Sequence, residues 1–538
     1  MRLLHRLPLV ASLGTAALWG QQPQHAVAIV NDPRSHGQIG DNLLSLNEAI
    51  MLHNRTLLTS QMSQAEQMQI GFIGGDIAVA DIDTTQVPTV TLERDLDTIV
   101  NLPHGLNISG SPYPATIDIG TTNGFLVDSD YCDFRRLILR GGAEAVRVVQ
   151  RDTFYGSTFE NVRFEGQTNA AVQVYLTQND GETFLRFENS TFVNIPNPVR
   201  IDDLGRNRRG EIAMRGCLFD GGGEAFVVNL GPGGNSYNLR LDRSTFQNQT
   251  VAGLVVRRAN ASADRGVVLD LLDMVTRNVP TGISIDGHAS ALTDALVRMA
   301  DLTASGTALR LGGVGTNTKI AVEDSQFGGS LALAGGAVLR LDNVRQTGGS
   351  TDLDGTTGTT VSASRSAFAN VTTSVTGSSA ATFTGCRFDG GAISGTASSP
   401  VTIGSSYVGG LNLGANASAS GSIAVPQLAS THVAEQSIAL GGTIHLAHDL
   451  PAGYLGVWLF SLGTEQPTTQ LGMRVYMEMS TVSLYPGVWR GQGQAIFPMP
   501  NIRSLRGLDL VFQMLVGHDI GVPGPLQQMP PGGRVILR

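Results

Sequence analysis

A repeated pattern of apolar residues constrains the fold of this chain more than any other feature. The segments Leu185–Phe192, Ile212–Phe219, Leu239–Phe246 and Ile320–Phe327 share one plan, in which two apolar residues and a polar or glycine corner precede a large apolar anchor. Because one such repeat cannot bury its apolar face alone, the repeats must stack on one another. The anchors recur every 25 to 28 residues up to residue 327 and every 17 to 24 residues beyond it: Leu137, Phe164, Phe192, Phe219, Phe246, Met274, Leu302, Phe327, Val344, Phe368, Phe388 and Tyr407.

A second set of alternating apolar pairs follows most anchors up to residue 302. Alternation with period 2 places each pair on one face of a strand. Three short strands per repeat, joined by polar corners, predict an all-β, right-handed, single-stranded parallel β-helix over residues 85–422. A leucine-rich repeat is the competing solenoid, but its leucine pattern is not visible. The pairs are Val172/Val174, Val199/Ile201, Phe226/Val228, Leu254/Val256, Ile283/Ile285 and Leu309/Leu311.

Composition agrees with this class and excludes others. The chain has 66 glycines in 538 residues, and only 15% of its residues are charged. Lys and Arg number 36 against 45 Asp and Glu, so no excess of positive charge is present for nucleic acid. The three cysteines, Cys132, Cys217 and Cys386, each precede a phenylalanine by two residues. We interpret them as small buried residues and not as disulfide partners.

The two ends of the predicted rod differ in sequence from its middle. From about residue 345 to 422 the chain is rich in Gly, Ser, Thr and Ala, and the continuing anchors favour shorter coils over a flexible linker. At the other end, Leu43, Leu46, Ile50 and Leu57 recur at helical spacing. They predict an amphipathic helix over 43–57, capped by Asp41 or Asn42, that covers the first coil.

The segment Asn42–Ile50 resembles the Cys-Ser-Leu-Arg-Glu-Ala motif at the start of many bacterial surface β-helix proteins. It departs from that motif at Leu44, where the family has Cys, and at Asn47, where it has Arg. The rod itself resembles the pectin-lyase-like β-helix. These resemblances imply an exported or cell-surface protein, but they do not imply one activity.

The remaining segments complete the expected domain organisation. Residues 1–20 combine a basic start with a short apolar stretch, as in a secretory signal peptide; a buried N-terminal helix is the alternative. Residues 21–84 are expected to cap the β-helix. Residues 430–538 contain about six strand-like segments, which predict an antiparallel β-sandwich. No other stretch is long and apolar enough to predict a transmembrane helix.

No complete catalytic set is found in the sequence, so no catalytic residue is assigned. The carboxylates that a polygalacturonase needs on adjacent coils are missing: Asp202 and Asp203 stand alone, and Gly517-His518-Asp519 lies in the C-terminal module. His445 and His448 are expected on opposite faces of a strand, which disfavours a metal site. No cofactor is expected.

One corner concentrates charge in a rod that has little of it. Arginine forks can bind sugar carboxylates or sulfates, and loops on rigid scaffolds commonly hold binding residues. We therefore expect this corner, between Ile201 and Ile212, to be the ligand contact on the rod; a solvated loop with local ion pairs is the alternative. Its residues are Asp202, Asp203, Arg206, Arg208 and Arg209, with Arg200 beside them.

Two functional classes follow from these observations. The first is a secreted or cell-surface, non-catalytic β-helix protein with a structural or adhesive role, which binds acidic polysaccharides or cell-surface glycans. The second is a polysaccharide lyase or glycoside hydrolase. The missing carboxylate set favours the first.

Overall fold

The computed structural model describes the chain from residue 25 to residue 537, with internal gaps. The predicted signal segment, residues 1–20, lies outside the described residues. The residues without a description are 1–24, 71–77, 101–104, 111–112, 130, 151–153, 232–234, 259–266, 288–291, 313–317, 356–357, 379, 405, 410, 421–429, 434–436, 451–452, 463–467, 471–472, 476, 478–480, 506–507, 519–526, 529–532 and 538.

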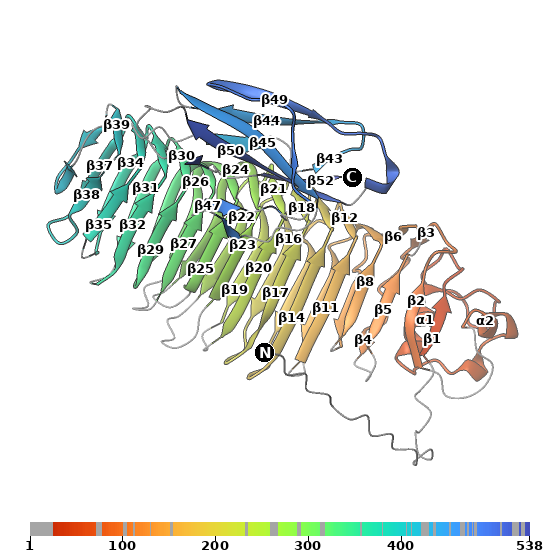
Figure 1. Cartoon of the computed structure of the whole chain (residues 1–538). Coiled ribbons are helices and arrows are strands. Elements are labelled where there is room, and N and C mark those ends of the chain that lie inside the picture. Colours follow the sequence, from red (N-terminus) through yellow and green to blue (C-terminus); the bar gives the residue numbers. More distant parts are fainter. Residues whose placement is uncertain are drawn as a thin grey trace, which may run out of the picture.

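The protein is all-β, with 62% of the described residues in strands and 4% in helices. Most strands wind into a long solenoid with three faces, and a smaller module lies against its side (Figure 1). Each solenoid strand pairs in parallel with the equivalent strand one coil away. This arrangement confirms the predicted parallel β-helix.

Among the described residues, the first face is one sheet of 16 strands. In order along the rod its strands are β1 (His25–Ile29), β2 (Ala78–Asp83), β5 (Leu106–Ser109), β8 (Cys132–Arg135), β11 (Phe154–Glu160), β14 (Glu182–Glu188), β17 (Arg209–Arg215), β20 (Ser236–Asp242), β23 (Val267–Leu272), β25 (Leu292–Arg298), β27 (Lys319–Glu323), β29 (Val338–Asp342), β32 (Thr360–Ser364), β35 (Ala380–Thr384), β38 (Val401–Gly404) and β41 (Ala417–Ser420).

The second and third faces share three long strands that run from one face onto the other, β24 (Val275–Gly287), β26 (Asp301–Gly312) and β28 (Gln326–Gly335). The second face also contains the short strands β3 (Thr89–Thr91), β6 (Ala115–Gly120), β9 (Leu137–Gly141), β12 (Arg163–Glu165), β15 (Thr191–Val193), β18 (Leu218–Asp220), β21 (Thr245–Gln247), β30 (Arg345–Thr347), β33 (Ala367–Ala369), β36 (Arg387–Asp389) and β39 (Tyr407–Gly409). The third also contains β4 (Ile99–Val100), β7 (Phe125–Asp128), β10 (Glu144–Gln150), β13 (Ala170–Leu176), β16 (Asn197–Asp203), β19 (Glu224–Leu230), β22 (Ala252–Arg258), β31 (Ser350–Gly355), β34 (Thr372–Thr376), β37 (Ala392–Gly395) and β40 (Asn412–Leu413).

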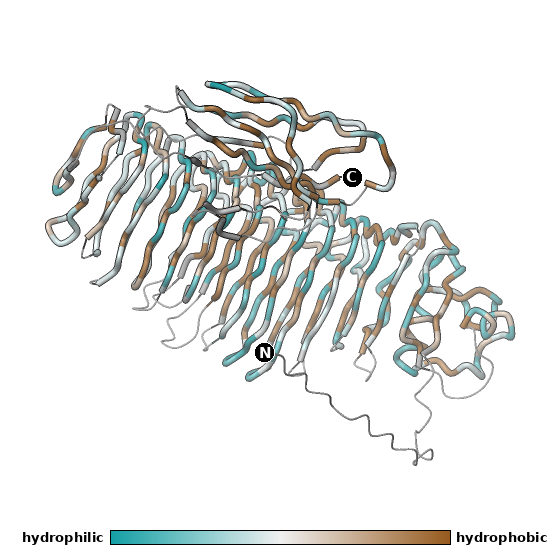
Figure 2. The backbone as a smooth tube through the Cα atoms, viewed as in Figure 1, coloured by the Kyte–Doolittle hydropathy of each residue, from teal (hydrophilic) through white to brown (hydrophobic). Residues whose placement is uncertain are grey.

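The core of the rod consists of aligned columns of inward side chains. Apolar and polar residues alternate along the strands (Figure 2), as expected where only one face of a strand is buried. The predicted pairs are all in register: Val172 lies opposite Val199, which lies opposite Phe226, and the column continues through the later coils. The Gly- and Ser-rich stretch after residue 345 also forms coils, which excludes the linker alternative for its described part.

The predicted anchors need correction at four coils. Phe164, Phe192, Phe219 and Phe246 do form one column. The positions predicted at Leu137, Met274, Val344 and Tyr407 are occupied in that column by Leu139, Thr276, Gln346 and Val408.

The error has a physical cause, because two of these positions hold buried polar side chains that satisfy their hydrogen bonds inside the rod. Gln346 Nε2 donates to the carbonyl oxygens of Gly329 (3.0 Å) and Ser350 (2.9 Å), and Thr276 Oγ1 donates to that of Thr303 (3.1 Å). A search for apolar anchors passes over such residues.

Corners between the first and second faces use a repeated serine that the sequence analysis missed. The residue immediately before each serine has a left-handed backbone conformation, as in Asn189 (φ 48°) and Arg243 (φ 50°). The serine hydroxyl then accepts the N–H of the equivalent residue in the preceding coil: Ser190 from Val162 (3.2 Å) and Ser244 from Cys217 (3.0 Å). Each corner is therefore tied to its neighbour by a side chain as well as by the sheet.

The cysteines are buried free thiols, which confirms their predicted packing role. Only Cys132 lies in a strand; Cys217 and Cys386 occupy the corner position that serine holds in other coils. Burial raises the pKa of the Cys217 and Cys386 thiols to about 12. These thiols are therefore unreactive near neutral pH.

The N-terminal end of the rod is covered by helix α1, which is shorter than predicted and begins later. It spans Leu46–His53 and is followed by η1 (Thr59–Gln61) and α2 (Gln64–Met68). Its cap is Ser45 and not Asp41 or Asn42: Ser45 Oγ accepts the N–H of Glu48, whose carboxylate accepts the N–H of Ser45 (2.8 Å). This capping box uses two residues that match the bacterial surface motif.

His53 at the end of α1 makes the stability of this cap depend on pH. Its Nδ1 lies 2.7 Å from the Val79 carbonyl oxygen, and burial lowers the pKa of His53 below its ordinary value. Because the unfolded chain binds the proton more readily, the contribution of His53 is complete above about pH 6.5 and is lost as the pH falls toward the lower folded pKa. We expect His53→Gln to flatten the fall in melting temperature between pH 7 and 5, and an unchanged profile would contradict this.

The C-terminal module is a two-sheet sandwich that contains five of the six predicted segments and several shorter strands, whereas the segment that begins at Met473 lies in a separate hairpin. One sheet contains β42 (Ser430–Val433), β44 (Thr443–Asp449) and β49 (Gln492–Pro498). The other contains β43 (Ser437–Ile438), β52 (Gly533–Leu537), β50 (Asp509–His518), β45 (Tyr454–Leu462), β48 (Ser483–Leu484) and β51 (Gln527–Gln528). The remaining elements are the hairpin of β46 (Thr468–Gln470) with β47 (Met473–Val475), and η2 (Arg503–Leu505).

The module has its own core, and it contacts the rod through both charged and apolar side chains. Trp458 and Phe512 are fully buried between its sheets. Against the rod, the Arg243 guanidinium donates to both carboxylate oxygens of Asp509 (2.9 Å each), and both residues are largely buried. Met299 of the rod packs with Val511 and other apolar side chains of the module. The module is therefore held along the side of the rod (Figure 1).

Candidate functional site

The predicted corner lies between β16 and β17, and the structure divides its residues into buried and exposed sets. Asp203 is buried inside the rod, where its carboxylate accepts hydrogen bonds from Asn235 Nδ2 (2.7 Å), Tyr237 Oη (2.8 Å) and the N–H of Gly205 (3.1 Å). Burial raises the pKa of Asp203 to about 6, although the hydrogen bond from Tyr237 and the charge of Arg208 act in the opposite direction.

Arg208 is fully buried beside Asp203, and its Nε lies 3.7 Å from Asp203 Oδ1. Its terminal nitrogens donate to the Gln178 carbonyl oxygen and to Thr183 Oγ1, each at 2.8 Å. These partners belong to the preceding coil. Asp203 and Arg208 therefore hold adjacent coils together and do not face solvent.

Asp202 points outward from β16 into a polar row on the third face. It accepts hydrogen bonds from Gln173 Nε2 (2.8 Å), Asn229 Nδ2 (2.6 Å) and Arg200 Nε (3.0 Å). Its neighbours belong to three successive coils. Asp202 is thus already surrounded by donors in the free protein.

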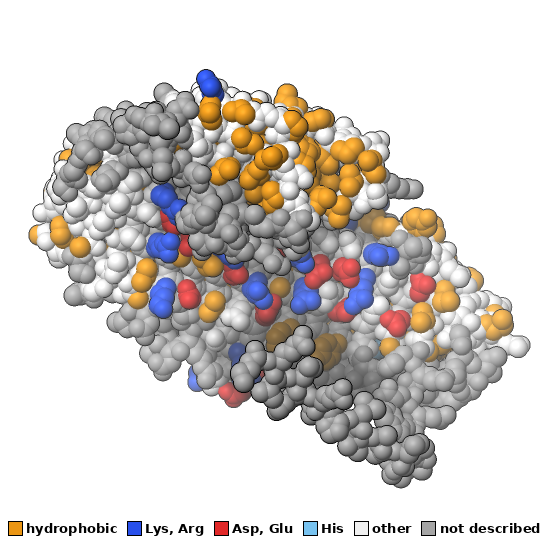
Figure 3. Space-filling model, viewed as in Figure 1, with side chains coloured by type: hydrophobic (Ala, Val, Ile, Leu, Met, Phe, Trp, Pro, Cys, Tyr) orange, Lys and Arg blue, Asp and Glu red, His pale blue; other side chains and the backbone are white. Residues whose placement is uncertain are grey.

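Arg206 and Arg209 are the exposed arginines of the corner. Arg209 pairs with Glu182 of the preceding coil, through Nε to Oε1 at 2.7 Å, and the N–H of Arg206 donates to Asn179 Oδ1 (2.9 Å). Ligand binding by this corner stays a prediction, and of the five residues predicted to bind, Asp203 and Arg208 are buried and Asp202, Arg206 and Arg209 lie on the outside of the rod. Local pairing of this kind is common on the rod, where basic and acidic side chains lie in one band (Figure 3).

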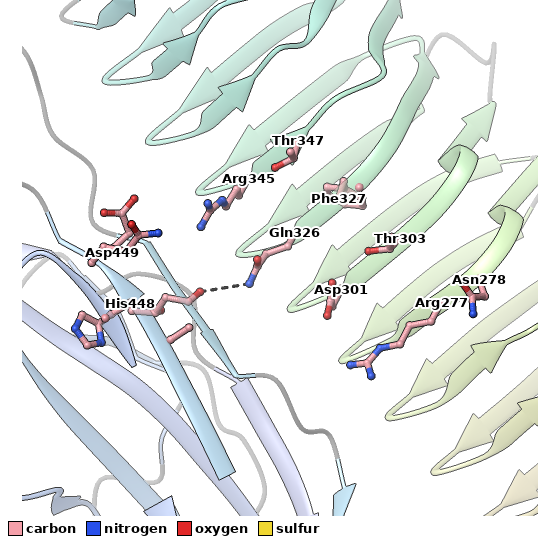
Figure 4. A pocket seen from close by; sticks show the side chains of 15 residues that line it. Arg277, Asn278, Asp301, Thr303, Gln326, Phe327, Arg345, Thr347, His448 and Asp449 are labelled. Carbon is pink, nitrogen blue, oxygen red and sulfur yellow. Dashed lines mark hydrogen bonds between the residues drawn. The ribbon is translucent and has the colours of Figure 1, made fainter. Parts of the chain in front are cut away.

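A cleft lies elsewhere, where the second face of the rod meets the C-terminal module. Its volume is about 790 Å³. The rod contributes outward residues of β24, β26, β28 and β30, and the module contributes the ends of β44 and β49 with Thr431 of β42. Gln326 Nε2 donates to the Thr431 carbonyl oxygen (3.3 Å) and joins the two walls (Figure 4).

The register of the rod explains the order of side chains on its wall of the cleft. Asp301, Gln326 and Arg345 lie opposite one another on successive coils. Arg277 belongs to the coil before Asp301, on the neighbouring outward column. In Figure 4 the guanidinium groups of Arg277 and Arg345 point toward the module.

The module wall adds an acid and a buried histidine. Asp449, the last residue of β44, lines the cleft. His448 beside it turns its ring into the module, near Trp489, and burial lowers the pKa of His448. His445 lies on the opposite face of β44, as the sequence predicted. The cleft therefore presents two arginines, two aspartates and several neutral hydrogen-bonding groups to a ligand.

These cleft residues were not predicted from the sequence, although a signal was present. Asp301 and Gln326 each precede an apolar anchor by one residue, which places them on the outside of the rod. The residues of the module wall had no comparable signal, because the position at which the module docks on the rod cannot be derived from the period of the apolar pattern. In the described part of the chain, no group of three or more His, Cys, Asp or Glu is arranged to hold a metal ion. The Gly517-His518-Asp519 segment is only partly described.

Comparison with known proteins found no similar protein. No protein-family model, no curated protein and no solved structure matches this chain. Among the described residues, no helix has the length and apolar character needed to cross a bilayer. The likeness of residues 42–50 to the bacterial surface motif, and of the rod to the pectin-lyase-like family, therefore rests on the residues quoted above.

Proposed function

We propose that the protein is an exported, non-catalytic β-helix scaffold that binds acidic polysaccharides in the cleft between the rod and the C-terminal module. The observation that carries this proposal is the pair Arg277 and Arg345, which face the module across the same cleft. Planar guanidinium groups form paired hydrogen bonds with carboxylates and sulfates. Asp301 and Asp449 supply acceptors for sugar hydroxyls.

The spacing of the two arginines favours a polymer over a single sugar. Their strands, β24 and β30, are separated by β26 and β28, so they lie three coils apart. At one strand spacing per coil this distance is about 14 Å along the rod. A ligand that contacts both guanidinium groups must therefore be an extended chain that runs along the rod axis.

Three features of the sequence support export and the absence of catalysis. The basic start and short apolar stretch of residues 1–20 fit a secretory signal, and residues 42–50 resemble a surface-protein motif. The carboxylate set of polygalacturonases is incomplete. A surface scaffold that holds a glycan without cleaving it agrees with these features.

The double substitution Arg277→Ala with Arg345→Ala tests the proposal. Each arginine is expected to contribute about 1 kcal/mol or more through charged hydrogen bonds, so the affinity for polygalacturonate should fall at least about tenfold. The variant should also show a weaker dependence of binding on salt, because fewer charge pairs are made. Calorimetric titration with polygalacturonate, alginate and chondroitin sulfate measures both effects.

The matched control is Arg206→Ala with Arg209→Ala at the exposed corner. Equal binding by the wild-type protein and the cleft variant would contradict the proposed site, and a loss of binding in the control alone would assign the ligand to the corner. Release of reducing ends or of unsaturated products during the titration would favour the alternative class, a polysaccharide lyase or glycosidase.

A further inference from the structure

The C-terminal end of the rod exposes part of its core. In the last coil, Leu413 lies opposite the fully buried Ile393, yet 41% of Leu413 is exposed. Ala419 lies opposite the buried Ile403 and is itself exposed. The final layer of inward side chains thus faces solvent.

In the part of the chain that the structure describes, the backbone of this coil is also unpaired along one edge. Among the described residues, β40 pairs only with β37 and β41 pairs only with β38. The C-terminal module lies along the side of the rod and leaves the last coil exposed (Figure 1). An open strand edge of this kind is a template for pairing with another strand.

The edge lacks the features that normally prevent such pairing. Proteins protect open edges with charged side chains, proline or bulges. The sequence from residue 390 to residue 434 contains no Asp, Glu, Lys or Arg, although the whole chain has a net charge of −9. The strands β38 to β41 contain no proline. Another uncharged edge can therefore approach without repulsion between like charges.

The opposite end of the rod is closed, which restricts the partner. Leu46 and Ile50 of α1 are fully buried in the same core as the first coils. Beside β1, the N–H of Ile29 donates to the Gln69 carbonyl oxygen (2.9 Å), and the N–H of Asn31 donates to that of Leu44 (3.0 Å). A head-to-tail stack of copies is therefore blocked.

We propose that the C-terminal end of the rod is a dimer interface, at which the last coil of one copy pairs with the last coil of a second copy. The contact uses the same surface on both chains and buries Leu413 and Ala419. Because each chain offers one open end, the assembly closes at two copies and does not grow into a filament.

Sedimentation analysis of the full chain tests this interface. The wild-type protein should be a dimer at micromolar concentrations, and Leu413→Lys with Ala419→Lys should give a folded monomer with an unchanged circular dichroism spectrum. Thr382→Lys, at an exposed position of β35, is the matched control and should remain a dimer. A monomeric wild-type protein, a dimeric edge variant or open-ended oligomers would each overturn the proposal.

Hydrogen exchange of the wild-type protein keeps the proposal testable if the edge variant does not fold. The amides of β41 should become more protected as the protein concentration rises and the dimer forms. Protection that is already complete at the lowest concentration would mean that a segment of the same chain covers the edge. Protection that never develops would show that no partner pairs there. Either result would overturn the proposal.

Discussion

Arg208→Ala is expected to lower the free energy of unfolding by about 3–5 kcal/mol, because it leaves the buried Asp203 carboxylate without its countercharge. Arg208 is fully buried and spans two coils through Gln178 and Thr183. Its loss also removes these hydrogen bonds. Urea unfolding, monitored by circular dichroism, measures the effect.

The pH dependence of this variant provides an internal check. Without Arg208 the folded-state pKa of Asp203 should rise further above its unfolded value. The destabilisation by the unpaired Asp203 carboxylate is therefore present at high pH, and it decreases as the carboxylate takes up a proton. The loss of stability should therefore shrink between about pH 8 and about pH 5. Arg206→Ala, at the exposed part of the same corner, is the control and should change stability by less than about 0.5 kcal/mol. Equal effects of the two substitutions would contradict the buried role of Arg208.

Phe192→Ala is expected to have a similar effect, about 3–5 kcal/mol, because it opens a cavity in the middle of the aromatic column. The Phe192 ring stacks on Phe164 and Phe219, with centroid distances of 4.8 Å and 4.3 Å. Phe192→Leu should cost less, since most of the volume is kept. Scanning calorimetry gives the comparison.

Thr191→Ala is the matched control, since Thr191 precedes Phe192 in β15 and points away from the core. A fall in melting temperature as large as that of Phe192→Ala would mean that the stacked rings do not dominate the stability of this part of the rod.

The period-2 alternation of apolar and polar residues predicted most of the rod, because it marks the inward positions of each half-buried strand directly. It failed where a polar side chain is inward and satisfied, as at Gln346 and Thr276. The same alternation, extended to the end of β16, would have distinguished the inward from the outward residues of the corner. Val199 and Ile201 share a face with Asp203, so Asp203 had to point inward and Asp202 outward.

Other features depend on contacts that no local pattern reveals. The Ser45 cap of α1 has a readable signature, a serine followed three residues later by glutamate, but the apolar spacing alone extended the helix to residue 57. The cleft joins Arg277 and Arg345 of the rod to Asp449 of the module. Arg345 and Asp449 are more than 100 residues apart in the sequence, and the ion pair of Arg243 with Asp509 that holds the module is not periodic.

The central proposal is that an extended acidic polysaccharide lies in the cleft between the rod and the module. A calorimetric titration of the wild-type protein with galacturonate oligomers of increasing length tests it most directly. We expect the affinity to rise with oligomer length until the oligomer reaches both Arg277 and Arg345, about 14 Å apart along the rod, and then to level off. A single sugar that binds as tightly as the long oligomers, or no binding at any length, would contradict it.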